Sequence, residues 1–447
     1  MPATAAATGP VPSIASHQLV VLLTDVGLLL ILAFLLGRLA MRLRMPAIVG
    51  ELCAGVLVGP SVLAHLSPAA SAWLLPHNPA QMHLLDAVAQ IGLLLLVGIT
   101  GIQADLGLIR RRAGTAAITG ISGLVIPLAA GFGLALLLPA SLIAGHSSRP
   151  TFALFIGVAV GVSALPVIAK TLTDLRLLHR DIGQLILCAV TVDDTLGWVL
   201  LAVVSALAAG KLEATGVGRL LGGLALVILV AVISRPLVRA GLRVAAARPE
   251  PGPLIATLVI LIILASAATQ ALGLEAVFGA LIGGIVISSC GVVEPARLAP
   301  LRVTVLSVLA PLYFATAGLR MNLTALGRPS VLLAGVAVLA VAIVAKFAGA
   351  YAGARLSRLG HWPSLALGAG MNSRGVVEVI VAMVGLQLGL LTSAMYTIIV
   401  LVAIVTSLMA PPMLRWATAR IDASAEETMR ESIYGDEPVP SPETAGR

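Results

Sequence analysis

The chain has 447 residues, of which 59% are hydrophobic and 11% charged, and its mean hydropathy is +1.06. Soluble domains carry about 25% charged residues, so this composition excludes a soluble protein and predicts one that lies in a membrane. The net charge of +8 does not indicate a nucleic-acid partner, because the basic residues fall in short loops between apolar stretches, where they set membrane orientation.

Long apolar segments follow one another along most of the chain. In chain order they cover residues 18–41, 45–64, 84–104, 113–141, 151–173, 182–209, 217–238, 253–272, 274–291, 299–319, 329–354, 362–386 and 393–416. A helix of about 20 apolar residues spans the hydrocarbon core, whereas the strands of a membrane barrel alternate over about ten residues. The sequence therefore predicts an all-α polytopic protein with about 13 transmembrane helices in the lipid bilayer, over residues 18–416.

Basic residues are concentrated in alternate loops, for example at residues 110–112 and 235–248. Cytoplasmic loops carry the excess of Arg and Lys, which predicts an N-terminus outside and a C-terminus in the cytoplasm. Residues 1–17 lack the basic start of a signal peptide and are expected to remain as an extracellular segment. Residues 417–447 become polar and acidic, which is typical of a disordered tail. The predicted location is the cytoplasmic membrane of the cell.

Two adjacent aspartates, Asp193 and Asp194, stand inside the apolar segment 182–209. An ionised Asp at the centre of a membrane helix costs about 2.5 kcal/mol or more, so such residues usually face a cavity and bind an ion, a proton or a partner. Helical spacing places Thr191 and Asp194 on one face, while Asp193 points about 100° away toward a different neighbour. The pair is therefore the first candidate for a functional site.

Two motifs occur twice in the chain, at residues 47–58 and 276–287 and at residues 100–106 and 317–323. The copies begin an odd number of predicted crossings apart, so they enter the membrane from opposite sides. Inverted repeats of this kind characterise secondary transporters, whose substrate site lies near the midplane where discontinuous helices meet. We expect the repeats to cover about residues 45–209 and 274–416.

Each repeat contains a predicted helix break. The segment 151–173 is interrupted at residues 161–166, which end in Pro166, and the segment 362–386 is interrupted at residues 368–375 by glycines, polar side chains and a charge. A kink in a packed helix would explain one break. Because the breaks occur at matching positions of the two repeats, a functional role for both breaks is favoured. Broken backbone at membrane depth is tolerated only against protein or a water-filled cavity.

The motifs at residues 46–51, 163–167, 192–198 and 371–378 resemble those of the monovalent cation:proton antiporters of the second type. The resemblance is greatest to Kef-type transporters and plant cation/proton exchangers, and it covers about residues 18–416. It implies the sodium/proton antiporter fold, with two broken helices that cross beside the aspartates. It also implies a scaffold domain that forms a homodimer and a mobile core domain.

The resemblance further implies a role for individual residues. Asp194 would be the carboxylate that cation and proton share, and Asp193 would pair with a lysine in the span before the second break, which Lys346 matches. Gly161 departs from the pattern, because relatives often have Ser there, although Ser163 keeps its usual hydroxyl. The choice between Na⁺ and K⁺ stays open.

The chemistry also follows from the residue types. A dry cavity favours the protonated form of a carboxylate, and a dehydrated Na⁺ or K⁺ competes for the same oxygens, so proton and cation exclude each other. Exchange by alternating access follows if the site can move between the two sides of the membrane when it holds a proton or a cation, but not when it is empty and charged. Further ligand oxygens are expected from Ser163, Thr191 and Asn372, beside Asp193 and Asp194.

Other charges in the apolar segments have competing interpretations. Glu51 and Glu378 are equally compatible with a functional role and with a structural hydrogen bond. Arg374 is expected to neutralise helix ends or an acid such as Glu378, and Arg320 to reach the outer membrane interface with its long side chain.

The sequence is compatible with two alternatives to antiport. A gated cation channel is compatible with repeats and breaks but gives no use for a carboxylate pair matched with an intramembrane lysine. An ion-sensing membrane protein would need more than the short acidic tail. No catalytic residue set, cofactor motif or metal cluster stands out, so we expect no enzyme activity, no cofactor and no metal beyond the transported cation.

The predicted topology can be tested with single cysteines. Cysteines at Ala69 and Thr392 should react with a membrane-impermeant maleimide from outside, and those at Gly360 and Ser424 only from the cytoplasm. Permeabilised cells provide the control for reactivity at all four positions. The opposite labelling pattern would reverse the orientation.

Overall fold

The computed structural model describes residues 15–43, 45–74, 79–103, 113–145, 148–177, 180–208, 214–248, 250–422 and residue 427. Within these ranges the chain is helical, and its β pairing is limited to one isolated bridge between Ile143 and Leu391. The predicted all-α class is confirmed. Nearly all of the predicted extracellular segment and most of the predicted tail lie outside the described residues.

The helices follow in an order close to the predicted segments. The N-terminal half contains α1 (Ser16–Arg42), α2 (Ala47–Val58), α3 (Leu63–Leu66), α4 (Pro68–Leu74), α5 (Pro79–Gln103), α7 (Ala113–Leu137), α8 (Arg149–Gly161), α9 (Leu165–Asp174) and α10 (Asp181–Ala208). The C-terminal half contains α11 (Ala214–Ala246), α12 (Pro251–Ala271), α13 (Ala276–Ser289), α14 (Ala299–Thr304), α15 (Ala310–Leu319), α16 (Pro329–Leu356), α17 (His361–Met371), α18 (Val376–Gln387) and α19 (Ser393–Thr418). A π-helical turn at Val305–Leu309 joins α14 to α15.

Not every predicted span is a full-length helix. Ten helices of the described chain are long and apolar enough to cross a membrane, or eleven if the bent pair α17 and α18 forms one span. The predicted segments 151–173 and 274–291 yield the shorter apolar helices α8, of 13 residues, and α13, of 14 residues. The count of about 13 is therefore not confirmed. The physical reason is that α8 ends at a break and that α13 is too short to span alone.

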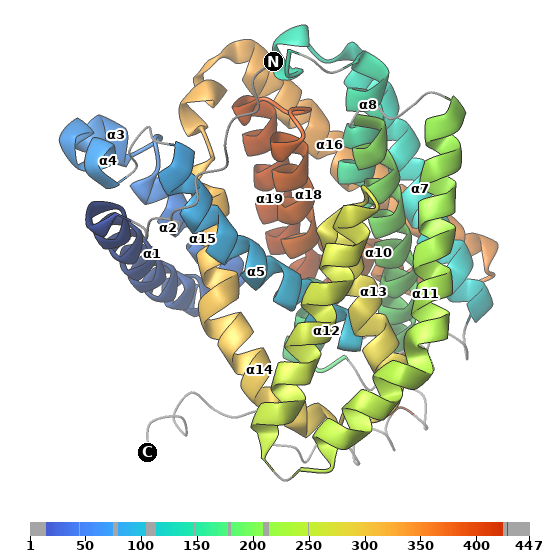
Figure 1. The fold of residues 1–447 in the computed structure, drawn as a ribbon. Helices are drawn as coiled ribbons and strands as arrows, with labels where there is room; N and C mark the ends of the chain where they lie inside the picture. Colours follow the sequence, from blue (N-terminus) through green and yellow to red (C-terminus); the bar gives the residue numbers. More distant parts are fainter. Residues whose placement is uncertain are drawn as a thin grey trace.

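Two sets of helices pack mainly within themselves. One set contains α1, α2, α5, α12, α13 and α15, and the other contains α7, α8, α10, α16, α17, α18 and α19. Figure 1 shows α1, α2 and α15 together on one side of the molecule, and α18 beside α19 near its middle. The second set contains both broken segments and the helix that carries the aspartate pair.

Glycines allow two close helix crossings within the first set. A Cβ atom built on Gly318 of α15 would lie 3.0 Å from the Cα of Gly55 in α2. A Cβ on Gly284 of α13 would lie 2.9 Å from the Cα of Gly101 in α5. Gly55 and Gly284 are equivalent in the internal repeat, as are Gly101 and Gly318. The same contact is thus made twice, each time between one copy and the other, which supports the predicted repeat.

The two predicted breaks are present as non-helical segments. Helix α8 ends at Gly161 and α9 begins at Leu165, so Pro166 is the second residue of α9, where its missing N–H leaves no helical bond unmade. The non-helical residues 162–164 lie within the predicted break at 161–166, but they precede Pro166, which does not remove a helical hydrogen bond as expected and whose side chain lies outside the described part. Helix α17 ends at Met371 and α18 begins at Val376, with an angle of 44° between them.

Candidate functional site

Direct hydrogen bonds hold the two breaks together. The backbone N–H of Ala164 donates to the carbonyl of Ser373 at 3.2 Å, and the hydroxyl of Ser163 donates to the carbonyl of Met371 at 2.8 Å. These partners belong to segments more than 200 residues apart in the sequence. Backbone N–H and C=O groups that have no partner within a helix thus form hydrogen bonds across the crossing. Inside a membrane such groups need a partner in the protein, because no water is available.

The first aspartate is used to fix this crossing. Asp193 accepts a hydrogen bond from the backbone N–H of Ser163 at 2.8 Å, and its other oxygen lies 2.7 Å from the Nζ atom of Lys346. Lys346 also donates to the carbonyl of Gly161, the last residue of α8. The side chains of Asp193 and Lys346 are fully buried, so each charge depends on the other. The predicted pairing of Lys346 with Asp193 is present.

Arg374 neutralises the same helix end from the other break. Its guanidinium donates to the carbonyls of Ala159 and Val160 in the last turn of α8 and, at 2.9 Å, to the carbonyl of Ala342 in α16. It also forms an ion pair with Glu378 at 3.1 Å. Cations are favourable at a helix C-terminus, where the carbonyl dipoles point. Both roles expected for Arg374 are observed, and Glu378 takes part in an ion pair.

Asp194 has a different environment from its neighbour. The residue is 4% exposed, and its Oδ1 atom has no hydrogen-bond partner among the described residues. Trp198 follows Asp194 by one turn of α10 and therefore lies on the same face of this helix. In the second break, the side-chain oxygen and nitrogen of Asn372 and the hydroxyl of Ser373 also lack partners within the described chain. Buried polar atoms left without partners mark a place for a water or an ion.

The two predicted hydroxyl ligands make internal hydrogen bonds. Thr191 donates to the carbonyl of Leu187 at 2.7 Å, and Ser163 donates to Met371 as described. Each hydroxyl oxygen keeps lone pairs that can still accept. Ser407 of α19 donates to the carbonyl of Arg374 and holds the second break, a role that no sequence pattern indicates, because a serine in an apolar span has no distinguishing feature.

The buried charges of the site do not cancel. Three carboxylates (Asp193, Asp194 and Glu378) face two cations (Lys346 and Arg374), and all five side chains are buried. When all are ionised, three negative and two positive charges leave one negative charge. The ion pairs use Asp193 and Glu378, so the uncompensated charge falls on Asp194.

A family model described as "Sodium/hydrogen exchanger, transmembrane" matches residues 29–420. The chain belongs to the sodium/hydrogen exchanger family. The resemblance seen in the sequence motifs is thereby confirmed at the level of the family. Membership also makes this a multi-pass membrane protein of a transporter family.

The proteins that are similar to this chain differ in length. Cation/H⁺ antiporter 17 of Arabidopsis thaliana is 30% identical over 403 residues, which are 89% of this chain but 48% of the plant protein. The chain thus spans about half the length of its plant relative. The Na⁺/H⁺ antiporter NhaS4 of Synechocystis is 29% identical over 89% of this chain and 97% of its own length.

A solved structure shares the fold. The sodium proton antiporter MjNhaP1 of Methanocaldococcus jannaschii superimposes with a TM-score of 0.65 at 17% identity, over 90% of this chain and 97% of the other. The match confirms the predicted antiporter fold for this exchanger family member.

The buried ion pair generates a prediction about stability. Lys346→Ala should lower the thermal stability markedly, because it strands Asp193 and removes a donor to Gly161; such losses are about 3–5 kcal/mol. Asp193→Asn together with Lys346→Gln should recover part of the loss, since neither charge remains. Thermal unfolding of the purified variants in detergent measures both effects. A double variant less stable than Lys346→Ala would contradict the pairing as the cause.

Proposed function

We propose that this protein is a secondary active antiporter that exchanges a monovalent cation, Na⁺ or K⁺, for protons by alternating access. The observation that carries the proposal is that, among the five buried charged groups of the site, one negative charge is uncompensated, and it falls on Asp194, the residue next to the one that holds the crossing. One proton or one monovalent cation neutralises it. The names of the relatives support the same substrates, because they include a Na⁺/H⁺ antiporter of Synechocystis and a K⁺/H⁺ antiporter of Saccharomyces cerevisiae.

Asp194 is the shared cation and proton site in this proposal. Among the described residues, its Oδ1 atom has no hydrogen-bond partner, and neither do the side chains of Asn372 and Ser373 in the second break. Ser163 and Thr191 supply further oxygen lone pairs. Hard monovalent cations favour such oxygen ligands, and a bound proton removes the charge that attracts them. Asp193, Lys346, Arg374 and Glu378 keep the crossing rigid around this site.

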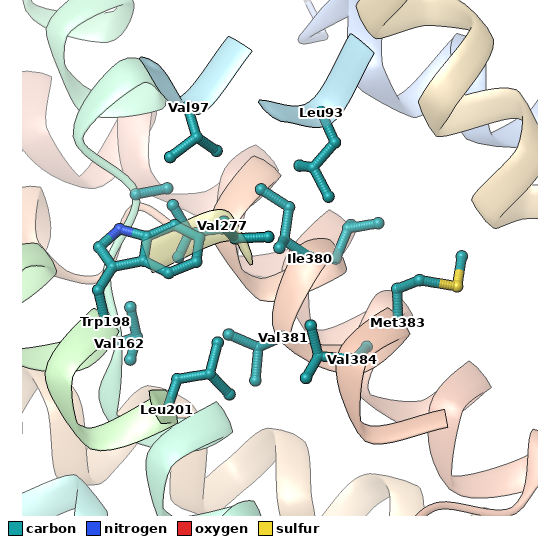
Figure 2. Close-up of a cluster of buried hydrophobic side chains, with 14 of the residues drawn as sticks. Leu93, Val97, Val162, Trp198, Leu201, Val277, Ile380, Val381, Met383 and Val384 are labelled. Atoms are coloured by element: carbon teal, nitrogen blue, oxygen red, sulfur yellow. The ribbon is translucent and has the colours of Figure 1, made fainter. Parts of the chain in front are cut away.

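Alternating access requires that the site be closed to at least one side at a time. Apolar side chains from several helices fill the space next to Trp198, which Figure 2 shows with Leu93, Val97, Val162, Leu201 and Val277. An ion cannot cross such a layer without losing its hydration. The set of helices that contains the site would move against the other set to open this layer. Thirteen crossings, the outside N-terminus, the cytoplasmic membrane and the homodimer remain predictions.

Replacement of the shared carboxylate tests the site. Asp194→Asn should abolish cation-dependent proton movement while the protein still folds, because an amide keeps the shape but carries no charge and takes up no proton. Dequenching of a pH dye in proteoliposomes with Na⁺, K⁺ or Li⁺ measures the exchange. Asp25→Asn, a matched change at another buried carboxyl in α1, provides the control. Robust exchange by Asp194→Asn would refute the assignment.

The charge count also predicts the stoichiometry. If Lys346 keeps its proton and stays paired with Asp193, one proton replaces one cation, and exchange should not respond to an imposed membrane potential. Proteoliposomes with a potassium-valinomycin potential and Na⁺ as substrate measure this. Exchange driven by the potential would instead indicate a second proton. The Asp193→Asn, Lys346→Gln variant would then show whether Lys346 carries it, because the response to the potential would disappear.

A further inference from the structure

A second polar pocket lies at the boundary between the two sets of helices. It is lined by Asp86 and Gln90 of α5, Tyr313 and Thr316 of α15, and Met383 and Gln387 of α18. Helices α5 and α15 belong to the set without the aspartate pair, and α18 follows the second break directly. The pocket therefore joins the two parts that would have to move relative to each other.

Oxygen atoms dominate the polar lining of this pocket. The Tyr313 side chain is 2% exposed, and its hydroxyl has no hydrogen-bond partner among the described residues. Thr316 donates to the carbonyl of Leu312 at 2.9 Å, which leaves its oxygen lone pairs available. The amide side chains of Gln90 and Gln387, each with one oxygen that can accept, and the carboxylate of Asp86 also line the pocket. This donor set suits a cation.

Asp86 is occupied by an internal cation. Nη2 of Arg320 contacts both carboxylate oxygens of Asp86 at 2.6 Å. A single guanidinium nitrogen therefore binds both oxygens, in place of the usual arrangement in which two nitrogens each bind one oxygen. The Nε atom of Arg320 has no partner within the described chain. The side chains are 25% and 28% exposed, which places the pair at the mouth of the pocket and not in its interior. From the sequence, Arg320 was expected only to reach the membrane interface on the outer side.

The pocket and Asp194 lie at opposite ends of one apolar layer. Leu93 and Val97 follow Gln90 on α5 by one and two helical turns, and Ile380 and Val384 precede Gln387 on α18. Figure 2 shows these four side chains directed into the same cluster as Trp198. Met383 is common to the pocket lining and the cluster. Because Trp198 lies one turn after Asp194 on the same face of α10, the apolar layer stands between the pocket and the proposed ion site.

We propose that this pocket is a second binding station for the transported monovalent cation, in which the cation and the Arg320 guanidinium compete for the carboxylate of Asp86. The inference rests on the proposed antiport function, and in the proposed orientation the station faces outward. A cation that displaces Arg320 from Asp86 waits next to the apolar layer until the two sets of helices move. The single carboxylate favours a monovalent over a divalent ion.

Removal of the charge of Asp86 and removal of the charge of Arg320 should have opposite effects on the KM for the cation, which tests the proposal. Asp86→Asn should raise the KM for cation added on the pocket side by about tenfold, the effect expected for loss of one charge-assisted contact. Arg320→Gln should lower the same KM, because Asp86 loses its competitor. Neither change should alter the KM for cation on the other side. Side-specific initial rates in oriented proteoliposomes, with Na⁺ and K⁺ as probes, measure these constants.

Controls separate binding from structure. Arg328→Gln removes an exposed arginine at the start of α16 and should leave both constants unchanged, while Asp86→Glu should retain most of the affinity. A purely structural ion pair predicts that Asp86→Asn and Arg320→Gln change both sides in the same direction, which would overturn the proposal. If Asp86→Asn fails to fold, an unchanged KM in Arg320→Gln overturns it equally. Absence of exchange in the parent protein would instead refute the proposed function.

Discussion

The ion pair between Lys346 and Asp193 is the interaction on which the rest of the site depends. Its two buried charges compensate each other, and their remaining hydrogen-bonding capacity is used on the backbone of the first break, at Gly161 and Ser163. A buried pair of this kind contributes little net stability over an apolar packing, but it is costly to disrupt once present. Its physical value here is that it fixes an irregular backbone segment at membrane depth, where unsatisfied carbonyls would otherwise be unfavourable.

The adjacent aspartates have unequal roles because a helix rotates by about 100° per residue. Asp193 points to the crossing, where Ser163 and Lys346 use both of its oxygens. Asp194 points to a different side of α10, next to Trp198, and keeps an oxygen without a partner among the described residues. Arg374 and Glu378 form a second compensated pair in the other break. Two compensated ion pairs therefore lie beside a single uncompensated carboxylate, the group that we propose cation and proton share.

The fold isolates this group through two different kinds of packing. Gly55 with Gly318 and Gly101 with Gly284 let helices of the first set approach at backbone distance, which makes that set compact. The contact between the two sets near the site is instead formed by branched apolar side chains and Trp198 (Figure 2). Apolar side chains slide past one another without breaking hydrogen bonds, whereas glycine crossings interlock. In the proposed exchange, the two sets would therefore move relative to each other at the boundary beside Asp194.

The sequence by itself determined the all-α membrane class, the approximate order of the helices and the positions of Asp193, Asp194, Lys346 and Arg374. These features follow from hydropathy and from charges that are too costly to occur in apolar segments without a reason. Its family resemblance also predicted the pairing of Lys346 with Asp193. The first break lies within the predicted residues 161–166, but Pro166 stands in the first turn of α9, after the break.

Only the tertiary structure decided how these groups share their partners. Three interactions depend on contacts between segments that are distant in the chain. Arg374 donates to carbonyls of α8, Ser407 supports the second break, and Asp86 binds Arg320. Such contacts leave no local pattern, since a serine or an aspartate near a helix end looks the same whether or not a partner stands opposite. The charge balance at Asp194 likewise becomes visible only when five residues from three segments are brought together.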